Sequence, residues 1–452
     1  MQRTILNRLA IVVTALLCLA ITSRAQAPGQ TPARPSMKGA VIKGKAPVNK
    51  EVLKVKLPKP YETKLSNGLQ VLVLEDHKLP QFSVQMVVLS GGLADPAALP
   101  GAAQYTATLL REGTKTRDSK QIAEQLDQLG ASIFANAGLS SISTNVTASG
   151  LTDNFDAIME LFADVVLQPS FPAEELNKLK TRNIAQLRFQ RAQAGFLANE
   201  MFSKVTYGAH PAARVSLTAE QIQRLTPEVL QSYHATHFKP NNAIFGIVGD
   251  VKPAEIVAKL EKIFAAWKPG EVPKTTIPQV ADTGGAKIYL IDRPGSVQTN
   301  LLAGTLTITR TDPDYFALEM MNQVVGGGPS ARLFMNLRED KGYTYGAYSN
   351  VSSFKYRGRF QANTEVRTDV TEGSVRELLY EFKRIRDEKT SPDEFERAKR
   401  TIVELKPLQP GDVADSTADF SELERVTGFR PKTTTREGVR AYVDWFRGYY
   451  KV

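Results

Sequence analysis

Two of the chain's four histidines stand close enough together to share a metal ion. His234 and His237 are three residues apart, a spacing that places both imidazoles on one face of a helix. The pair comes shortly before Pro240, where a helix is expected to end. No third ligand lies nearby in the sequence, although a protein zinc site needs three or four. We therefore interpret the pair as the surface end of a helix rather than as a metal site.

A second pair with chemical capacity is Arg338 and Tyr345, which lie seven residues apart in LREDKGYTY. A guanidinium offers hydrogen-bond donors in a fixed geometry, and a phenol can donate to a carbonyl oxygen as negative charge builds on it. Taken alone, the two residues fit an exposed cation at a helix end and an ordinary strand residue better than a site. Their interpretation depends on the elements that carry them.

Length and composition are those of an ordinary globular protein with room for two or more domains. The chain has 452 residues, of which 42% are hydrophobic and 23% are charged. Its net charge of +10 is concentrated near the start: residues 1–27 carry +3, residues 28–59 carry +7, and the remainder is close to neutral. Residues 26–60 are rich in Pro and Gly and predict a flexible basic linker, not a nucleic-acid site, since no aromatic residues interleave with the cations.

The first 25 residues have the pattern of a secretory signal peptide. Arg3 and Arg8 precede a short apolar run at residues 9–21, and small residues follow, with cleavage favoured after Ala25. The only cysteine, Cys18, lies inside this segment, so the mature chain has no disulfides. We expect a periplasmic or secreted protein with no integral membrane span after cleavage.

Hydrophobic periodicity predicts a series of strands and helices that occurs twice along the chain. Pro172 and Pro392 each open a helix with acidic residues in its first turn, and these two prolines are 220 residues apart. A repeat of that length indicates two domains of one fold and an α+β class. The first series comprises a hairpin at 62–74, a strand at 82–89, helices at 101–111 and 119–129, two strands within 131–149, a helix at 155–167, the Pro172 helix and a strand at 245–251. The second comprises strands at 288–292 and 299–306, a helix at 315–325, alternation over 342–363, a helix at 374–387 and the Pro392 helix.

Residues 101–114, GAAQYTATLLREGT, resemble the metal-site helix of the insulinase/pitrilysin-type zinc peptidases, whose pattern is close to G-L-A-H-x-x-E-H-M-L-x-x-G-T. The three metal-site positions hold Gln104, Ala107 and Thr108, whose amide, methyl and hydroxyl groups cannot hold zinc. The resemblance spans about residues 61–399 and implies two homologous αβ domains. Its other motifs, in chain order, are SNGLQVLV, YGAHP, FKPNNAIFGIVGDV and GGGPSARLFMNLREDKGYTYGAYS.

The same resemblance indicates which functional residues are lost and which are kept. Zinc-bearing members use a further glutamate on a later helix, and the matching stretch here is 183–187, NIAQL, which has no carboxylate. Their second domain supplies an arginine and a tyrosine to the zinc site, and Arg338 and Tyr345 have that spacing. The resemblance implies that these two residues bind substrate backbone and the developing oxyanion. Two-subunit members pair a zinc-bearing chain with a zinc-less chain that keeps Arg and Tyr, and this chain is similar to the second kind.

The end of the chain departs from the repeat. Residues 408–450 have no counterpart of FKPNNAIFGIVGDV and resemble the C-terminal end of UDP-glucuronate epimerases of the extended short-chain dehydrogenase type. The chain thus resembles a fusion of a peptidase-like part with an epimerase-like end, joined near residues 401–406. The fusion is either a genuine gene fusion or an artefact of sequence assembly. No Gly-x-Gly-x-x-Gly follows a first strand, and the glycines at 326–328 follow a helix. We therefore expect no NAD cofactor.

These observations predict an α+β protein with two insulinase/pitrilysin-type domains. Its predicted parts are a signal peptide at 1–25, a basic linker at 26–60, an N-terminal peptidase-like domain at 61–270, a truncated C-terminal one at 285–405 and an epimerase-like tail at 406–452. The predicted function is a zinc-less subunit of a periplasmic heterodimeric metallopeptidase. It would be inactive alone, with zinc on a partner subunit and a peptide as substrate. A pure structural scaffold and a sugar-nucleotide epimerase fragment are the alternatives.

Overall fold

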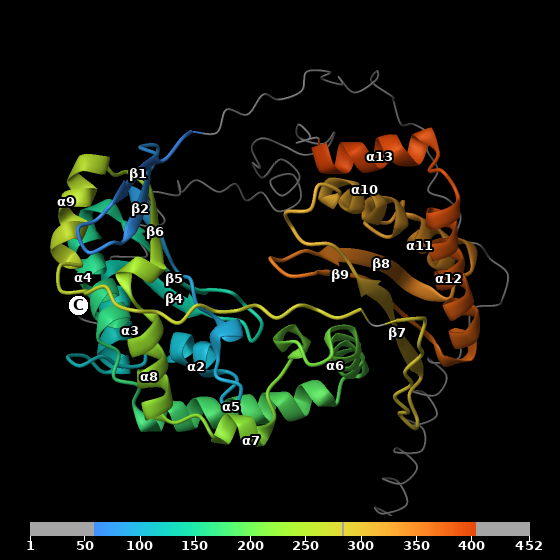
Figure 1. Ribbon diagram of the computed structural model, residues 1–452, viewed down its shortest axis with the longest axis horizontal. Coiled ribbons are helices and arrows are strands. Elements are labelled where there is room, and N and C mark those ends of the chain that lie inside the picture. Colours follow the sequence, from blue (N-terminus) through green and yellow to red (C-terminus); the bar gives the residue numbers. More distant parts are fainter. Residues whose placement is uncertain (1–57, 283, 404–452) are drawn as a thin grey trace, which may run out of the picture. The chain divides into compact units, whose positions relative to one another are not determined.

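The computed structural model describes residues 58–282 and 284–403. The expected signal peptide, the linker up to residue 57 and the epimerase-like tail lie outside the described residues. Within these ranges the chain forms two β-sheets, each flanked by helices (Figure 1), which confirms the predicted α+β class. None of the helices there is long and apolar enough to cross a membrane.

The first sheet contains six strands of the described chain in the order β1-β2-β6-β3-β5-β4. The hairpin β1–β2 turns at Asn67 and Gly68, where Gly68 takes a positive φ of 94°. Strand β6 lies between β2, to which it is parallel, and β3, to which it is antiparallel. The strands are β1 (Tyr61–Lys64), β2 (Gln70–Glu75), β3 (Gln81–Val88), β4 (Ser132–Asn136), β5 (Thr144–Leu151) and β6 (Ala243–Gly249).

Helix α4 is the centre of the core beside this sheet, because nearly every apolar side chain it carries is buried. Phe162 of α4 packs edge-on against Phe245 of β6, and Phe245 packs in turn against Phe264. Short 3-10 turns occur at η1 (Gly92–Ala94), η2 (Thr152–Asn154), η3 (Pro211–Ala213) and η4 (Pro240–Asn242). The helices are α2 (Ala102–Leu109), α3 (Ser119–Leu129), α4 (Phe155–Leu167), α5 (Ala173–Arg191), α6 (Ala194–Tyr207), α7 (Ala219–Gln223), α8 (Pro227–His237) and α9 (Pro253–Ile263).

The second sheet has three strands among the described residues, in the order β7-β9-β8. Helices α10 and α12 cover one of its faces (Figure 1), and Leu333, Ala362 and Leu378 are buried between them. The elements are β7 (Gln298–Leu306), α10 (Tyr315–Val325), α11 (Arg332–Phe334), the π-helical segment η5 (Met335–Asp340), β8 (Thr344–Ser352), β9 (Arg359–Arg367), the 3-10 turn η6 (Thr368–Val370), α12 (Thr371–Asp387) and α13 (Pro392–Val403).

The duplication predicted from the sequence is visible in the strand order. In the first sheet β3, β5 and β4 are neighbours in that order, and β7, β9 and β8 repeat the arrangement with the same antiparallel pairings. The helices that follow also correspond, since α4 and α5 come after the third of these strands just as α12 and α13 do. The predicted elements of both halves are therefore confirmed, apart from one strand.

The exception is the strand expected at residues 288–292, which is wrong. This segment has no strand structure, and its large apolar side chains are exposed. Alternating apolar residues favour a strand only where a neighbouring strand supplies hydrogen-bond partners. In the described part of the second sheet no strand lies beside β7 on the side away from β9. The segment thus has the composition of a strand, but among the described residues it has no neighbouring strand to bond to.

Candidate substrate-binding site and degenerate metal site

Helix α2 holds the three positions at which the resemblance places a metal. It begins after Gly101, whose φ of 94° suits glycine, and it places Gln104, Ala107 and Thr108 on one face. Ala107 is only 1% exposed, and the Thr108 hydroxyl donates to the Gln104 carbonyl at 2.9 Å. The helix therefore keeps the geometry of a metal-site helix, while its side chains offer no imidazole or carboxylate. These residues do not fit a zinc ion.

The further ligand position that the resemblance implies lies on α5, which contacts α2. The Asn183 side-chain amide donates to the buried Tyr105 hydroxyl at 2.9 Å, which joins α5 to α2. An amide here takes part in packing the two helices and supplies no carboxylate for a metal. Throughout residues 58–282 and 284–403, no three or more His, Cys, Asp or Glu side chains gather as a possible metal site.

We predict that the purified mature chain holds no stoichiometric zinc after dialysis against a weak chelator. The reason is the absence of ligands at Gln104, Ala107, Thr108 and across residues 183–187. Metal analysis by mass spectrometry should give well below one zinc per chain. A zinc-bearing member of the same family, dialysed in parallel, is the control. One tightly held zinc per chain would contradict the prediction.

The histidine pair lies at a helix end, as expected, but not at the surface. His237 is buried and its Nδ1 lies 3.0 Å from the Ser90 hydroxyl, while His234 stacks on Phe238. The His234 Nε2 atom is 2.7 Å from the Val166 carbonyl, so it carries a proton and donates. Burial lowers the pKa of His234 to about 4, although the hydrogen bond opposes this. The surface interpretation was therefore wrong: the rings are packed into the protein because their helix ends against α4 and the residues that follow β3.

One carboxylate that organises α2 was not predicted from the sequence. Asp95 accepts hydrogen bonds from the Gly101 N–H at 2.6 Å and the Ala103 N–H at 2.8 Å, which caps the start of the helix. Burial raises the pKa of Asp95 to about 6, even though these two hydrogen bonds act in the opposite direction. An acidic residue shortly before a glycine that begins a helix is the sequence pattern from which Asp95 could have been predicted.

We predict that Asp95→Asn removes one component of the pH dependence of stability. The native pKa of about 6 lies above the ordinary value of 3.8, so between these pH values the native state keeps a proton that the unfolded chain has released. The contribution of Asp95 is therefore complete below pH 3.8 and is lost as the pH rises through 6. Urea midpoints measured from pH 4 to 7 should fall less steeply in the variant than in the parent. Parallel curves would show that Asp95 does not titrate in this window.

The structure brings Arg338 and Tyr345 together. The Arg338 guanidinium carbon lies 5.4 Å from the centroid of the Tyr345 ring, within the range of a cation–π contact. Tyr345 is 85% exposed, and the Arg338 side chain is 41% exposed with only a loose ion pair to Glu339, at 3.9 Å. A cation and a phenol with their donor groups in solvent can both reach the backbone of an incoming peptide.

Both residues stand on irregular backbone. Arg338 lies in the π-helical η5, where the Lys341 N–H bonds to the Asn336 carbonyl at 3.0 Å, one residue further than in an α-helix. Tyr345 lies at a β-bulge, because the register of β8 on β9 shifts between Thr344 and Ala347. The Thr344 hydroxyl stabilises the bulge by donating to the Glu365 carbonyl at 2.6 Å. Both kinds of irregularity re-aim a side chain and are common at functional sites.

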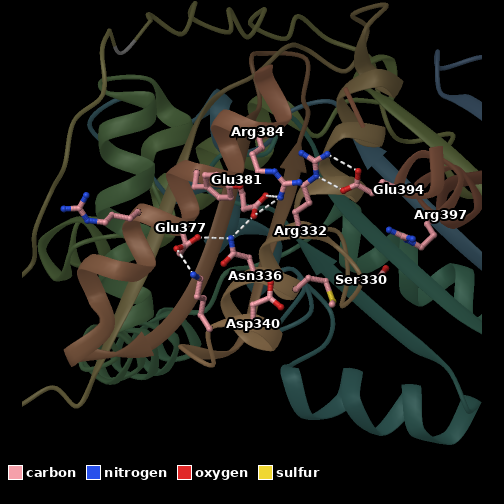
Figure 2. A pocket seen from close by; sticks show the side chains of 13 residues that line it. Ser330, Arg332, Asn336, Asp340, Glu377, Glu381, Arg384, Glu394 and Arg397 are labelled. Carbon is pink, nitrogen blue, oxygen red and sulfur yellow. Dashed lines mark hydrogen bonds and ion pairs between the residues drawn. The ribbon is translucent and has the colours of Figure 1, made fainter. Parts of the chain in front are cut away.

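A buried polar network holds η5 in place (Figure 2). The Asn336 amide of η5 donates to Glu381 at 2.7 Å and to Glu377 at 3.0 Å, both on α12. Just before it, Arg332 forms a bidentate pair with Glu394 of α13, at 2.7 and 3.0 Å. These residues line a cavity of about 670 Å³. No local pattern marks partners so far apart in the sequence, so this network was not predicted.

Comparison with known proteins identifies the family to which the fold just described belongs. Residues 70–218 match the family described as Insulinase (Peptidase family M16), and residues 224–402 match the Peptidase M16 inactive domain. A crystal structure of a peptidase M16 inactive domain from Pseudomonas fluorescens is 31% identical, with a TM-score of 0.71, over 76% of this chain and 83% of that one. The chain therefore belongs to the insulinase (M16) family of peptidases.

Two further matches agree with this assignment. An uncharacterized zinc protease of Mycobacterium leprae is 27% identical over 301 residues, which cover 66% of each protein. The crystal structure of a protease from Helicobacter pylori has a TM-score of 0.70 at 19% identity, covers 77% of this chain and 84% of that one, and supports the fold alone. The match to the inactive domain begins at residue 224, although β6 of the first sheet lies beyond that point.

Proposed function

We propose that this protein is a zinc-less subunit of a heterodimeric metallopeptidase, to which it contributes Arg338 and Tyr345. The observation that carries the proposal is the placing of these two exposed side chains side by side on a π-helical turn and a β-bulge. The metal positions on α2 meanwhile hold side chains that cannot bind zinc. The zinc would therefore be held by a partner chain of the same family.

In such a complex the two side chains have separate tasks. The Arg338 guanidinium offers several N–H donors in a plane, which suits the carbonyl groups of an extended peptide. The Tyr345 hydroxyl can donate to the carbonyl oxygen that becomes negative during attack. Neither group can activate water in place of a metal ligand, so the chain alone should not hydrolyse peptides. A zinc ion on the partner would supply the activated water.

We also propose a cellular location for the protein and a role for the two ends of the chain. The signal pattern of residues 1–25 supports secretion into the periplasm, and the basic segment 26–60 supports a tether. The tail 406–452 is proposed as a fused epimerase-like end, which carries no catalytic group or cofactor fingerprint of its own.

The proposal is tested by reconstitution. The mature chain is mixed with a zinc-bearing family member that retains His-x-x-Glu-His, and the product is sized by light scattering. We expect a one-to-one complex that cleaves a fluorogenic peptide library, while neither chain alone does so. A complex that forms without gaining activity supports the scaffold alternative. Cleavage by this chain alone, resistant to chelators, would exclude both.

A further inference from the structure

Residues 287–292 and strand β7 reproduce the sequence layout of β2 and β3. In the first half, residues 76–80 separate β2 (QVLVLE) from β3, and in the second half the equally long segment 293–297 separates KIYLID from β7. The chain thus contains a second copy of the β2–β3 unit, aligned without a gap. The two copies nevertheless differ in structure, because only the first forms two strands.

The difference has a direct cause in the sheet topology. In the first sheet β2 and β3 do not touch, since β6 lies between them and bonds to both; Gly246, for example, is paired with Leu72 and with Gln85. Among residues 284–403 no counterpart of β6 exists, and β7 pairs only with β9. Figure 1 shows β7 at one edge of the second sheet. Residues 288–292 consequently have no strand beside them among the described residues, and Ile288 and Leu290 are 88% and 87% exposed.

The backbone of β7 is ready to accept a strand. Val297 and Thr307, which flank β7, are hydrogen-bonded to Thr368 and Gly358, the residues that flank β9. Alternate residues of an antiparallel strand bond to the same neighbour. Asn300, Leu302 and Gly304 therefore direct their N–H and C=O groups towards the other edge. Helix α6 reaches the face of β7, where Phe202 lies beside Gly304, rather than supplying strand hydrogen bonds. An unpaired edge of this kind is a template for strand addition.

We propose that β7 and residues 288–292 form a docking site for one extended, apolar β-strand from another polypeptide. The incoming strand would run antiparallel to β7 and parallel to 288–292, as β6 does in the first sheet. One face of it would extend the core around Leu301 and Ala362, so we expect about seven residues without charge or proline, the usual length of such a strand. This site is independent of Arg338 and Tyr345.

The composition of this chain's own tail argues for a separate polypeptide. Strand β6 and its flanks form an uncharged stretch over residues 240–249. The longest uncharged stretch in residues 404–452 is 407–411, PLQPG, which contains two prolines. Proline cannot donate a hydrogen bond to a central strand, so the composition of this stretch does not match that of β6.

The probe is a fluorescent peptide of residues 240–251, PNNAIFGIVGDV, with a C-terminal Lys-Lys for solubility, titrated into the mature full-length chain. We expect saturable binding by fluorescence anisotropy. Leu290→Lys should weaken it about tenfold or more, as expected when a buried leucine contact is replaced by a charge. Leu79→Lys is the control, because Leu79 is an exposed leucine in the turn between β2 and β3 of the first half, and this variant should bind like the parent. The same peptide with proline at the position of Ile247 should not bind.

Hydrogen exchange on the intact chain shows whether the edge of β7 is open or is already filled by this chain itself. We expect the amides of residues 298–306 that face the open edge to exchange quickly in the free chain and to be protected by the peptide. Edge amides that are already protected without peptide would mean that this chain fills the site itself, which overturns the proposal. Equal binding by the parent and Leu290→Lys would overturn it as well, whatever the result of the reconstitution with a zinc-bearing partner.

Discussion

Tyr345→Phe is expected to leave assembly with a zinc-bearing partner intact and to lower peptide turnover about a hundredfold. Removal of one preorganised donor to an oxyanion typically costs ~3 kcal/mol in the transition state. The ring is 85% exposed, so loss of the hydroxyl should not disturb folding. The measurement is kcat/KM of the reconstituted pair, with assembly checked separately by size. Tyr348→Phe, on the same strand β8, is the matched control and should retain the parent rate.

Arg338→Ala extends the same prediction. Its donors are proposed to contact the peptide backbone before the transition state, so KM should rise as kcat falls. The effects of the two variants should not add fully, because both groups act on one segment of substrate and contact each other. Arg376→Ala, an exposed arginine of α12, provides the control. Parent rates from both site variants in an intact complex would leave only a structural role for the pair.

Arg332→Met is expected to give the largest loss of stability, about 3–5 kcal/mol, because it leaves the Glu394 carboxylate without its buried partner. The Arg332 side chain is 5% exposed and donates twice to Glu394. The measurement is the free energy of unfolding in urea, followed by circular dichroism. Arg376→Met, which removes an exposed ion pair with Glu372, should cost no more than about 1 kcal/mol.

The pH dependence provides a second readout for the same pair. The hydrogen bond from Arg332 lowers the pKa of Glu394 to about 2, from an ordinary value of 4.5. This contribution to stability is complete above pH 4.5 and is lost as the pH falls towards 2. Arg332→Met should therefore be less sensitive than the parent across that window. A loss below about 1 kcal/mol at neutral pH, with an unchanged acid profile, would show that the pair is not needed for folding.

Local patterns in the sequence predicted most elements because those elements depend on local chemistry. Helix α3 was predicted with its observed bounds, and in the structure Asp118 and Gln121 form a capping box at its start. The bounds of α4 and α10 were likewise predicted from periodicity alone. Residues 288–292 have an equally good strand pattern, yet they do not form a strand, because a strand also needs a neighbour that no local pattern reveals.

The candidate site was predicted in part for a similar reason. Arg338, Tyr345, Gln104, Ala107 and Thr108 lie in contiguous motifs that the sequence displays directly. The contacts that hold η5 in place do not lie in contiguous motifs. Asn336 is hydrogen-bonded to Glu381 on another helix, and Arg332 is hydrogen-bonded to Glu394. Such partners come together only through the tertiary fold, and one sequence contains no signal for the pairing. The burial of His234 was missed because the end of α8 packs against residues far away in the chain.

Because η5 is a wide π-helical turn, the placement of Arg338 beside Tyr345 depends on the number of residues in this turn as well as on their types. A π-helical turn contains one residue more than an α-helix needs, so a single-residue deletion there could be absorbed without breaking β8. Such a deletion would shift the neighbouring side chains within η5 by about 100° around the helix axis. Arg338 would then turn away from Tyr345 although both residues remained. Among homologous chains, an alignment gap at this turn would therefore mark loss of the site even where the arginine and the tyrosine are both present.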